Sequence, residues 1–450
     1  MLGRAGEANP EGTSMTIPVV SRRSFQLGAA ALALSILATG CGAPGGSGDN
    51  GQVTLRFAWW GNEYLNGQTD KVIAAFEASH PNIKVKAEPG EWSSYWDKLA
   101  TKTAANDAPD VIQMDQKYIA EYGGRGALMD LSKQDGIDTS KLDKEALASG
   151  QYSGAQYGLS TGQNAYVIMA NTKVFEAAGI PVPDDKTWTW KEFMDTAAKL
   201  SAASDGKTYG AAYGSNEADL IIWLRQHGEN LYSADGKLGF EAGTAASFWE
   251  RLKEQRDSKA SPPANVATED GGASLEQSLF GTNRVGMAWW WTNQLGSLEA
   301  TTGSNIKMLR APSVDGAAAS NGMYYKPTMF WSASSRSKHP KEAAEFINYL
   351  TNSPEAGAIL MTDRGVPTNS DIVSSITSSL KPADTTVVGF LKDIAPDIKD
   401  APPVPPVGAG SVQNVIKRYT DEVLYDRQTP QAAAEAFKKE VQGMLDSARK

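Results

Sequence analysis

The chain has 450 residues, of which 43 are Lys or Arg and 52 are Asp or Glu, so its formal net charge at pH 7 is −9. This length is sufficient for two or three domains. The acidic balance argues against a nucleic-acid-binding protein, because such proteins need a basic surface. The sequence contains 1 cysteine, Cys41, so no disulfide can form within one chain and the fold depends on its hydrophobic core.

Residues 1–40 have the pattern of an export signal. An arginine pair, Arg22 and Arg23, precedes an apolar stretch over 27–39, which is too short to cross a bilayer as a helix. The pair resembles a twin-arginine export motif, and an ordinary positively charged segment is the alternative.

The end of this signal, residues 37–41, resembles the lipidation site of bacterial lipoproteins, in which small residues precede the modified cysteine. A lipid on Cys41 would hold the exported protein at the outer face of the cytoplasmic membrane. Residues 41–52 are rich in Gly and polar side chains, so we expect a flexible tether there.

From residue 53 onward, strand and helix patterns alternate, which favours an α/β architecture with parallel strands. The capping-box spacing of Thr189 and Glu192 predicts a helix start, and Thr429 before Pro430 predicts another. The expected strands are 53–60, 83–86 and 110–115, and the expected helices are 69–80, 93–105, 337–350 and 430–445.

A set of short motifs recurs in a defined order along the chain: residues 59–61 (WWG), 81–85 (PNIKV), 108–111 (APDV), 186–193 (KTWTWKEF), 280–289 (FGTNRVGMAW) and 338–347 (KHPKEAAEFI). Together they resemble the family 1 extracellular solute-binding proteins, the maltose-binding-protein-like receptors of ABC sugar importers. The resemblance covers nearly all of residues 53–450.

This resemblance implies a two-lobed, periplasmic-binding-protein-like α/β fold with a ligand cleft between the lobes and a hinge. It places residues 53–161 plus 290–338 in the N-terminal lobe and residues 162–289 plus 339–450 in the C-terminal lobe. It also implies a monomeric, lipid-anchored receptor that captures a carbohydrate and delivers it to an ABC permease. We expect no cofactor and no metal, and an oligosaccharide is favoured over a single sugar.

Tryptophan is the strongest chemical signal, with 12 in the chain. An indole plane covers the apolar face of a sugar ring, whereas polar side chains bind the hydroxyl groups at its edge. For any one tryptophan the alternative is a place in the core, and neighbours such as Trp289 and Trp290 face opposite ways in a strand. The candidate ligand-binding tryptophans are Trp59, Trp60, Trp92, Trp289, Trp291 and Trp331.

Polar candidates follow the expected strand ends, crossings and turns. The alternatives are a helix cap or surface charge for Glu63 and Asp115, and a salt bridge within the protein for Arg364. An arginine can also bind a uronic-acid carboxylate through two hydrogen bonds. The candidates are Glu63, Asp115, Gln163, Asn164, Asn293 and Arg364.

Catalytic motifs are weak. The 3 histidines are far apart in the sequence, and no metal-binding spacing such as HExxH or CxxC occurs. Residues 158–162 match GxSxG, but the residues that follow have a strand pattern where a nucleophile elbow needs a helix. We therefore expect a binding protein and not an enzyme. The alternative is an exported lipoprotein enzyme that acts on polysaccharide, such as a glycosidase or lyase.

Overall fold

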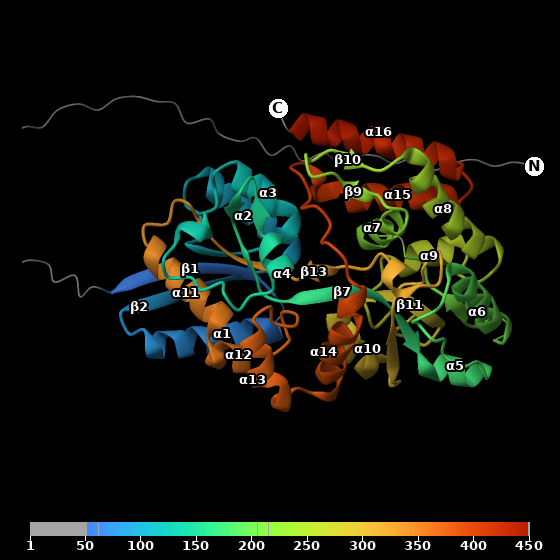
Figure 1. The fold of residues 1–450 in the computed structure, drawn as a ribbon, viewed down its shortest axis with the longest axis horizontal. Helices are drawn as coiled ribbons and strands as arrows, with labels where there is room; N and C mark the ends of the chain where they lie inside the picture. Colours follow the sequence, from blue (N-terminus) through green and yellow to red (C-terminus); the bar gives the residue numbers. More distant parts are fainter. Residues whose placement is uncertain (1–51, 62, 205, 215, 449–450) are drawn as a thin grey trace, which may run out of the picture. The chain divides into compact units, whose positions relative to one another are not determined.

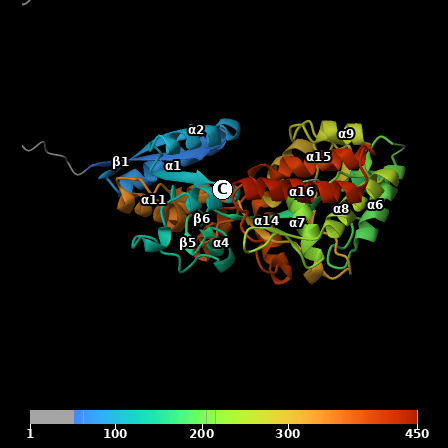
Figure 2. The same ribbon diagram turned by 90° about the horizontal axis from the view of Figure 1, so that it is seen from above.

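The computed structural model describes residues 52–61, 63–204, 206–214 and 216–448. The expected export signal, the lipidation site at Cys41 and the tether up to residue 51 lie outside these residues. The described chain forms two α/β lobes, each built around a five-stranded sheet (Figures 1 and 2). This confirms the expected two-lobed fold.

The first lobe has a sheet with the strand order β2-β1-β3-β14-β6. β1 is parallel to β2 and to β3, whereas β14 is antiparallel to β3 and to β6. Its elements are β1 (Val53–Trp60), α1 (Glu63–Ser79), β2 (Ile83–Gly90), α2 (Trp92–Ala104), β3 (Val111–Met114), α3 (Gln116–Gly124), η1 (Leu131–Lys133), α4 (Lys144–Ala148), β4 (Gln151–Tyr152), β5 (Ala155–Gln156), β6 (Leu159–Ser160), β14 (Phe330–Ala333), α11 (Pro340–Asn352), α12 (Pro354–Leu360), α13 (Ser370–Ile376) and η4 (Thr377–Ser379).

The second lobe has a sheet with the strand order β12-β7-β11-β8, and β13 also pairs with β7. β7 is antiparallel to its partners, and β11 is parallel to β8. Its elements are β7 (Gln163–Asn171), α5 (Thr172–Ala178), α6 (Trp190–Ala202), β8 (Tyr209–Ala211), α7 (Glu217–Gln226), β9 (Asn230–Tyr232), β10 (Leu238–Gly239), α8 (Ala242–Asp257), α9 (Ala264–Asp270), β11 (Val285–Trp291), η2 (Thr292–Gln294), α10 (Leu295–Thr302), β12 (Ile306–Leu309), η3 (Ala318–Ser320), β13 (Tyr325–Pro327), α14 (Pro382–Ile394), η5 (Ala395–Asp397), η6 (Ala409–Ser411), α15 (Val412–Leu424) and α16 (Pro430–Ala448).

Side-chain alternation along β1 gives the first sheet a core on each face. Phe57 and its alternate neighbours pack with α1 and α11, and the Phe57 and Phe346 rings lie 5.3 Å apart. Ala58 faces the other way, toward α2 and α3. This is the period of two that a strand requires, so helices cover both faces of the sheet.

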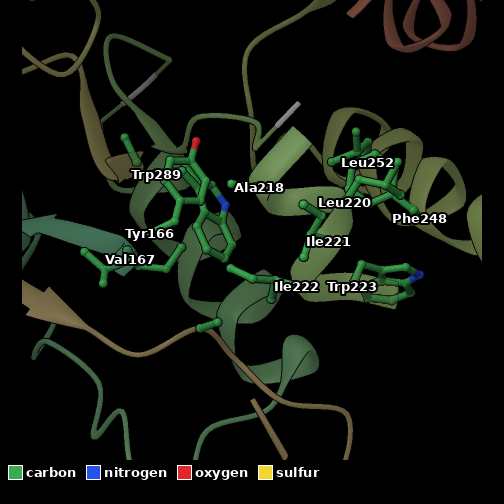
Figure 3. Close-up of a cluster of buried hydrophobic side chains, with 14 of the residues drawn as sticks. Tyr166, Val167, Ala218, Leu220, Ile221, Ile222, Trp223, Phe248, Leu252 and Trp289 are labelled. Carbon is green, nitrogen blue, oxygen red and sulfur yellow. The ribbon is translucent and has the colours of Figure 1, made fainter. Parts of the chain in front are cut away.

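The second core continues from β7 and β11 into α7 and α8. Figure 3 shows the Tyr166 and Trp289 rings side by side, and their centroids lie 5.2 Å apart with an interplanar angle of 15°. Phe248 and Leu252 of α8 belong to the same core and lie beyond α7 in this view. In Figure 2, α15 and α16 lie together over α8.

The chain crosses between the lobes between β6 and β7, between β13 and β14, and between η4 and α14. The first two crossings are joined by the Thr328 amide, which donates to the Gly162 carbonyl over 3.0 Å. The segment around Val366 in the first lobe also bonds to the first crossing, because the Gln163 amide donates to the Val366 carbonyl over 2.8 Å. Closely bonded crossings of this kind are suited to a hinge.

Two segments lie in the opposite lobe from the one that the sequence predicted. Residues 290–327 were assigned to the first lobe, but β11 and β12 pair with β7 in the second sheet. Residues 339–376 were assigned to the second lobe, but the apolar face of α11 packs on β1 and α1. In both cases pairing with a distant strand or helix decides the lobe, and local pattern carries no information on it.

Most expected elements are present, and their caps form as the sequence predicts. Thr189 and Glu192 form the capping box at α6, and the Thr429 hydroxyl accepts from the Ala432 amide at the start of α16. α1 begins at Glu63 and not at the expected residue 69. Among the described residues, no helix is long and apolar enough to cross a membrane.

Candidate functional site

A cavity of about 190 Å³ is lined by side chains from both lobes. The first lobe contributes Trp92, the start of α3 at residues 115–117, and Ser149. The second lobe contributes the start of α7, the ends of β9 and β11, β13 and the segment at 401–405. A cavity lined by two domains with mixed aromatic and charged groups is the usual setting of a small-ligand site.

The first-lobe residues reach the cavity because parallel strands end at the same edge of the sheet. Asp115 follows β3 directly and caps α3, where its Oδ1 accepts from the Lys117 amide over 3.1 Å. Trp92 is the first residue of α2, after β2 ends, and its side chain is 43% exposed. Trp60, at the end of β1, supports it with ring centroids 5.1 Å apart.

The second-lobe residues are positioned by the first turn of α7. Asn216 caps this helix through its side-chain oxygen, and its Nδ2 donates to the Tyr166 hydroxyl over 2.5 Å. Glu217 accepts a hydrogen bond from the Tyr232 hydroxyl over 3.1 Å. Burial raises the pKa of Glu217, and the positive charges of Lys117 and Lys326 partly offset this increase.

Two ammonium groups lie beside the two indoles. Lys326 Nζ lies 5.5 Å from the Trp291 ring centroid and 3.9 Å from Asp115 Oδ2. Lys117 Nζ lies 5.7 Å from the Trp92 ring centroid. Each cation–π contact is worth about 0.5–1 kcal/mol at such partly exposed positions. Because Lys326 belongs to β13 and Asp115 to the first lobe, this pair also links the lobes across the cavity.

The site therefore combines three chemical groups within one cavity. Lys117 and Lys326 donate hydrogen bonds, Asp115 and Glu217 accept them, and indole planes offer apolar surface. A ligand with hydroxyl groups and an apolar face matches this set. Among the described residues, no group of three His, Cys, Asp or Glu side chains is placed to hold a metal ion.

Comparison with known proteins identifies the fold family. The family model described as "Bacterial extracellular solute-binding protein" matches residues 71–384. The chain belongs to this family.

Similar proteins support the assignment over most of their length. A Streptomyces antibioticus protein named "Uncharacterized lipoprotein in oleD 5'region" is 28% identical over 74% of each chain. The arabinooligosaccharide-binding protein of Bacillus subtilis is 23% identical over 76% of this chain and 79% of its own. A solved family 1 extracellular solute-binding protein from Alicyclobacillus acidocaldarius has a TM-score of 0.70 and 28% identity, covering 88% of this chain and 98% of its own.

Four of the predicted site residues lie at or beside the cavity of this solute-binding protein. Trp92, Asp115 and Trp291 line it. Trp60 is half-buried and packs against Trp92 and Trp96. All four follow directly from the rule that binding groups gather where strands end.

Three predicted tryptophans lie in the cores instead. Trp59 is 0% exposed and donates its indole N–H to Asn66 Oδ1 over 2.8 Å. Trp331 is 1% exposed and packs edge-on against Phe57. Trp289 stacks on Tyr166 with 6% exposure. Trp59 faces the core because it takes the opposite face of β1 from Trp60. Trp289 shares its face of β11 with Trp291, but it lies two residues further from the strand end and is covered by the core around Tyr166.

Arg364 does not line this cavity either. Its side chain is 3% exposed, and its Nη2 donates to Thr69 Oγ1 over 2.6 Å while Nη1 donates to Gln113. Burial lowers the pKa of Arg364 to about 10. The guanidinium lies 5.3 Å from the Trp331 ring centroid, so it is part of the first-lobe interior. Arg364 therefore makes contacts within the protein and takes no part in lining this cavity.

The remaining candidates lie outside the cavity lining. Glu63 is exposed in the first turn of α1, and Asn293 is exposed in η2. Gln163 donates to Asp143 Oδ1 over 3.0 Å. Asn164 is buried and accepts from the Thr292 hydroxyl over 3.4 Å. The amides of Gln163 and Asn164 thus make contacts within the protein where the chain crosses between the lobes.

Several lining residues were not predicted: Lys117, Asn216, Glu217, Tyr232 and Lys326. The adjacent Asn216 and Glu217 could have been found as a helix start, because Asn is a strong N-cap. No local pattern marks Lys326 or Tyr232. The GxSxG match is structural, since the Ser160 hydroxyl is 3% exposed and donates to the Gly162 carbonyl over 2.8 Å, and a strand follows.

Proposed function

We propose that this solute-binding protein captures a carbohydrate in the cavity between its lobes and delivers it to the permease of an ABC importer. The observation that carries the proposal is the presence of two indoles, two ammonium groups and two carboxylates in one cavity. This set supports a polyhydroxylated ligand, because donors and acceptors alternate around a sugar ring while its C–H face is apolar. The named activity of the arabinooligosaccharide-binding relative agrees with this chemistry.

The ligand we favour is an oligosaccharide, because Trp92 from the first lobe and Trp291 from the second can each cover one ring. We also propose that the protein acts as a monomeric receptor without cofactor or catalysis. The test is a thermal-shift screen of residues 42–450 against neutral, amino and acidic di- and trisaccharides, with chromatography of the recovered sugar. A ligand at 100 times its Kd adds about 2.7 kcal/mol to stability, which raises Tm by several degrees.

The outcomes separate the two classes of function. A shift with intact sugar supports the receptor. Cleaved sugar would support the alternative of a polysaccharide-acting enzyme, for which Asp115 and Glu217 would be the two carboxylates. No shift with any saccharide would contradict the proposal.

Replacement of Trp291 by alanine is expected to weaken saccharide binding by about 1–3 kcal/mol, which is about 5- to 150-fold in Kd. Trp291 lines the cavity and its ring lies 4.9 Å from Tyr166. Titration calorimetry measures the loss. The matched control is Trp290→Ala, because Trp290 faces the other way on the same strand, toward Phe280. Equal weakening by both variants would show that the effect comes from the fold and not from ligand contact.

We further propose that a lipid on Cys41 anchors the protein to the membrane. The support is the small-residue pattern before this cysteine and the lipoprotein named among its relatives. Cys41→Ala is expected to move the protein from the membrane fraction to the soluble fraction without a change in ligand affinity. Fractionation followed by immunoblotting measures this, and a variant that stays with the membrane would contradict the lipid anchor.

A further inference from the structure

Residues 401–405, here called the proline segment, form one wall of the cavity. Ala401, Pro402, Pro403 and Pro405 all line it. The segment has the sequence Ala-Pro-Pro-Val-Pro and belongs to the connection between η5 and η6. In Figure 1 this connection is the orange-red chain that runs from α14 toward α15.

Both ends of the proline segment are fixed on the second lobe. Before it, Arg225 of α7 donates from Nη2 to the Asp400 carbonyl over 2.7 Å. After it, the Ala409 amide donates to the Pro406 carbonyl over 3.1 Å. Gly408 has φ of 92°, and a Cβ at this position would lie 2.6 Å from Ala448 Cβ, so the chain turns tightly against α16. The wall is therefore held at each end.

The segment between these anchors is stiff. Each proline fixes its own φ and forces the preceding residue into an extended conformation. Prolines at 402, 403, 405 and 406 thus restrict every residue from 401 to 406. A wall that is already ordered loses little conformational entropy when a ligand binds, so its shape and chemistry can discriminate between ligands.

The chemistry of this wall is asymmetric. Because proline has no backbone N–H, Val404 carries the only amide donor between residues 402 and 406. Within the part of the chain that the structure describes, no backbone amide donates to the carbonyl groups of 401–405. Apart from the Val404 amide, this wall can therefore offer a ligand only carbon atoms and carbonyl acceptors, whereas Lys117 and Lys326 on other elements supply donors to the cavity.

We infer that the proline segment determines specificity by requiring a neutral sugar ring at this wall. The C–H face or a methyl group of such a ring can pack against the proline carbons, and a hydroxyl group can donate to a carbonyl of the segment. A carboxylate or sulfate finds no partner there, because an anion held against this wall would lose its bound water without gaining a hydrogen-bond donor. The inference rests on the proposed carbohydrate function and adds to it the exclusion of uronic acids from this position.

The test compares a matched pair of disaccharides, α-1,4-galactobiose and α-1,4-digalacturonate, which differ only at C6 of each ring, where the first has a hydroxymethyl group and the second a carboxylate. The same comparison is made for every neutral saccharide that binds in the screen and its C6-oxidised counterpart. Wild-type protein is expected to prefer the neutral member by about 10-fold or more, because the carboxylate of the ring at the proline segment is unmatched even where Lys117 or Lys326 binds the other.

The double variant Pro402→Ala/Pro403→Ala restores two amide donors and loosens the wall, so the neutral preference is expected to fall by about 3- to 10-fold. The control is Pro396→Ala, which removes an exposed proline in η5 that does not line the cavity, and which should keep the wild-type ratio. Melting curves without ligand show whether each variant is folded. If a variant is not folded, the preference of the wild-type protein for the neutral saccharide over the acidic one decides the inference.

The outcomes distinguish the two levels of the proposal. If the acidic member binds wild-type protein as tightly as the neutral one, or if the double variant keeps the wild-type ratio, the wall does not set specificity although saccharide binding stands. If no saccharide of either kind binds wild-type protein, the proposed function fails and this inference fails with it.

Discussion

Replacement of Arg251 by methionine is expected to lower the free energy of unfolding by about 3–5 kcal/mol. Arg251 Nη2 lies 3.0 Å from Asp219 Oδ2, and the two side chains are 5% and 0% exposed. The guanidinium also lies 4.0 Å from the Trp190 ring centroid. Loss of the arginine leaves a carboxylate buried in an aromatic core without a counter-charge, which is the most costly way to break such a pair. Urea denaturation followed by tryptophan fluorescence measures the change.

A double-mutant cycle tests whether the pairing is the cause. Asp219→Asn removes the buried negative charge, so the double variant Arg251→Met/Asp219→Asn is expected to be more stable than Arg251→Met alone. The control is Lys191→Met, which breaks an exposed pair with Asp195 and should change stability little. Additive losses at 219 and 251 would contradict the coupling.

The same pair has a defined pH signature. Burial raises the pKa of Asp219 above its ordinary value of 3.8, although Arg251 opposes the increase. Between the ordinary pKa of Asp219 in the unfolded state and its raised pKa in the folded state, the folded protein binds more protons than the unfolded protein. The free energy of unfolding therefore falls as the pH rises through this window. Arg251→Met removes the opposing charge, so the window should extend to higher pH. Asp219→Asn should abolish this contribution, as measured by denaturation at a series of pH values.

This buried pair also connects stability to ligand binding. Asp219 lies in the first turn of α7, and the same turn carries Asn216 and Glu217 into the cavity. Arg251 comes from α8, so the pair fixes the start of α7 on its neighbouring helix. Because a binding site needs its groups held in place, a loosened α7 is expected to weaken ligand binding as well.

Local sequence signals predicted local structure well. The capping box at Thr189 and the period of apolar residues in α11 depend on neighbours within one helix, so the sequence contains what is needed. The lobe to which α11 belongs depends instead on Phe346 reaching Phe57, which lies 289 residues earlier in the chain. Such a contact leaves no trace in the local pattern.

The candidate site shows the same division. Asp115 could be predicted because a polar residue after a buried strand lies at the sheet edge. Lys326 could not, because its place over Trp291 depends on β13 pairing with β7. Tryptophan in a strand was an ambiguous signal from the start. Its side of the sheet and its distance from the strand end together decide between ligand and core, since Trp289 and Trp291 share one side of β11 and only Trp291 lines the cavity. The partner strands that fix these positions are distant in sequence.

Replacement of Trp331 by alanine is expected to cost about 3–5 kcal/mol of folding free energy, the range for removing a large buried aromatic side chain. Trp331 is 1% exposed, and its ring lies 5.6 Å from Phe57. Arg364 would also lose the indole face beneath its guanidinium. Denaturant titration measures the loss, and the folded fraction should keep the ligand affinity of the wild type.

Trp92→Ala serves as the matched control for Trp331→Ala, because it should weaken saccharide binding and leave stability nearly unchanged. Its indole is 43% exposed at the cavity, so stability should change little while saccharide affinity falls. If Trp331→Ala instead weakened binding without loss of stability, Trp331 would contact ligand in a conformation with a more open first lobe. If Trp92→Ala left affinity unchanged, the ligand would be held by Trp291 and the polar groups alone. Only the combination of a stable, weak-binding Trp92 variant and an unstable, tight-binding Trp331 variant agrees with the division between cavity and core described above.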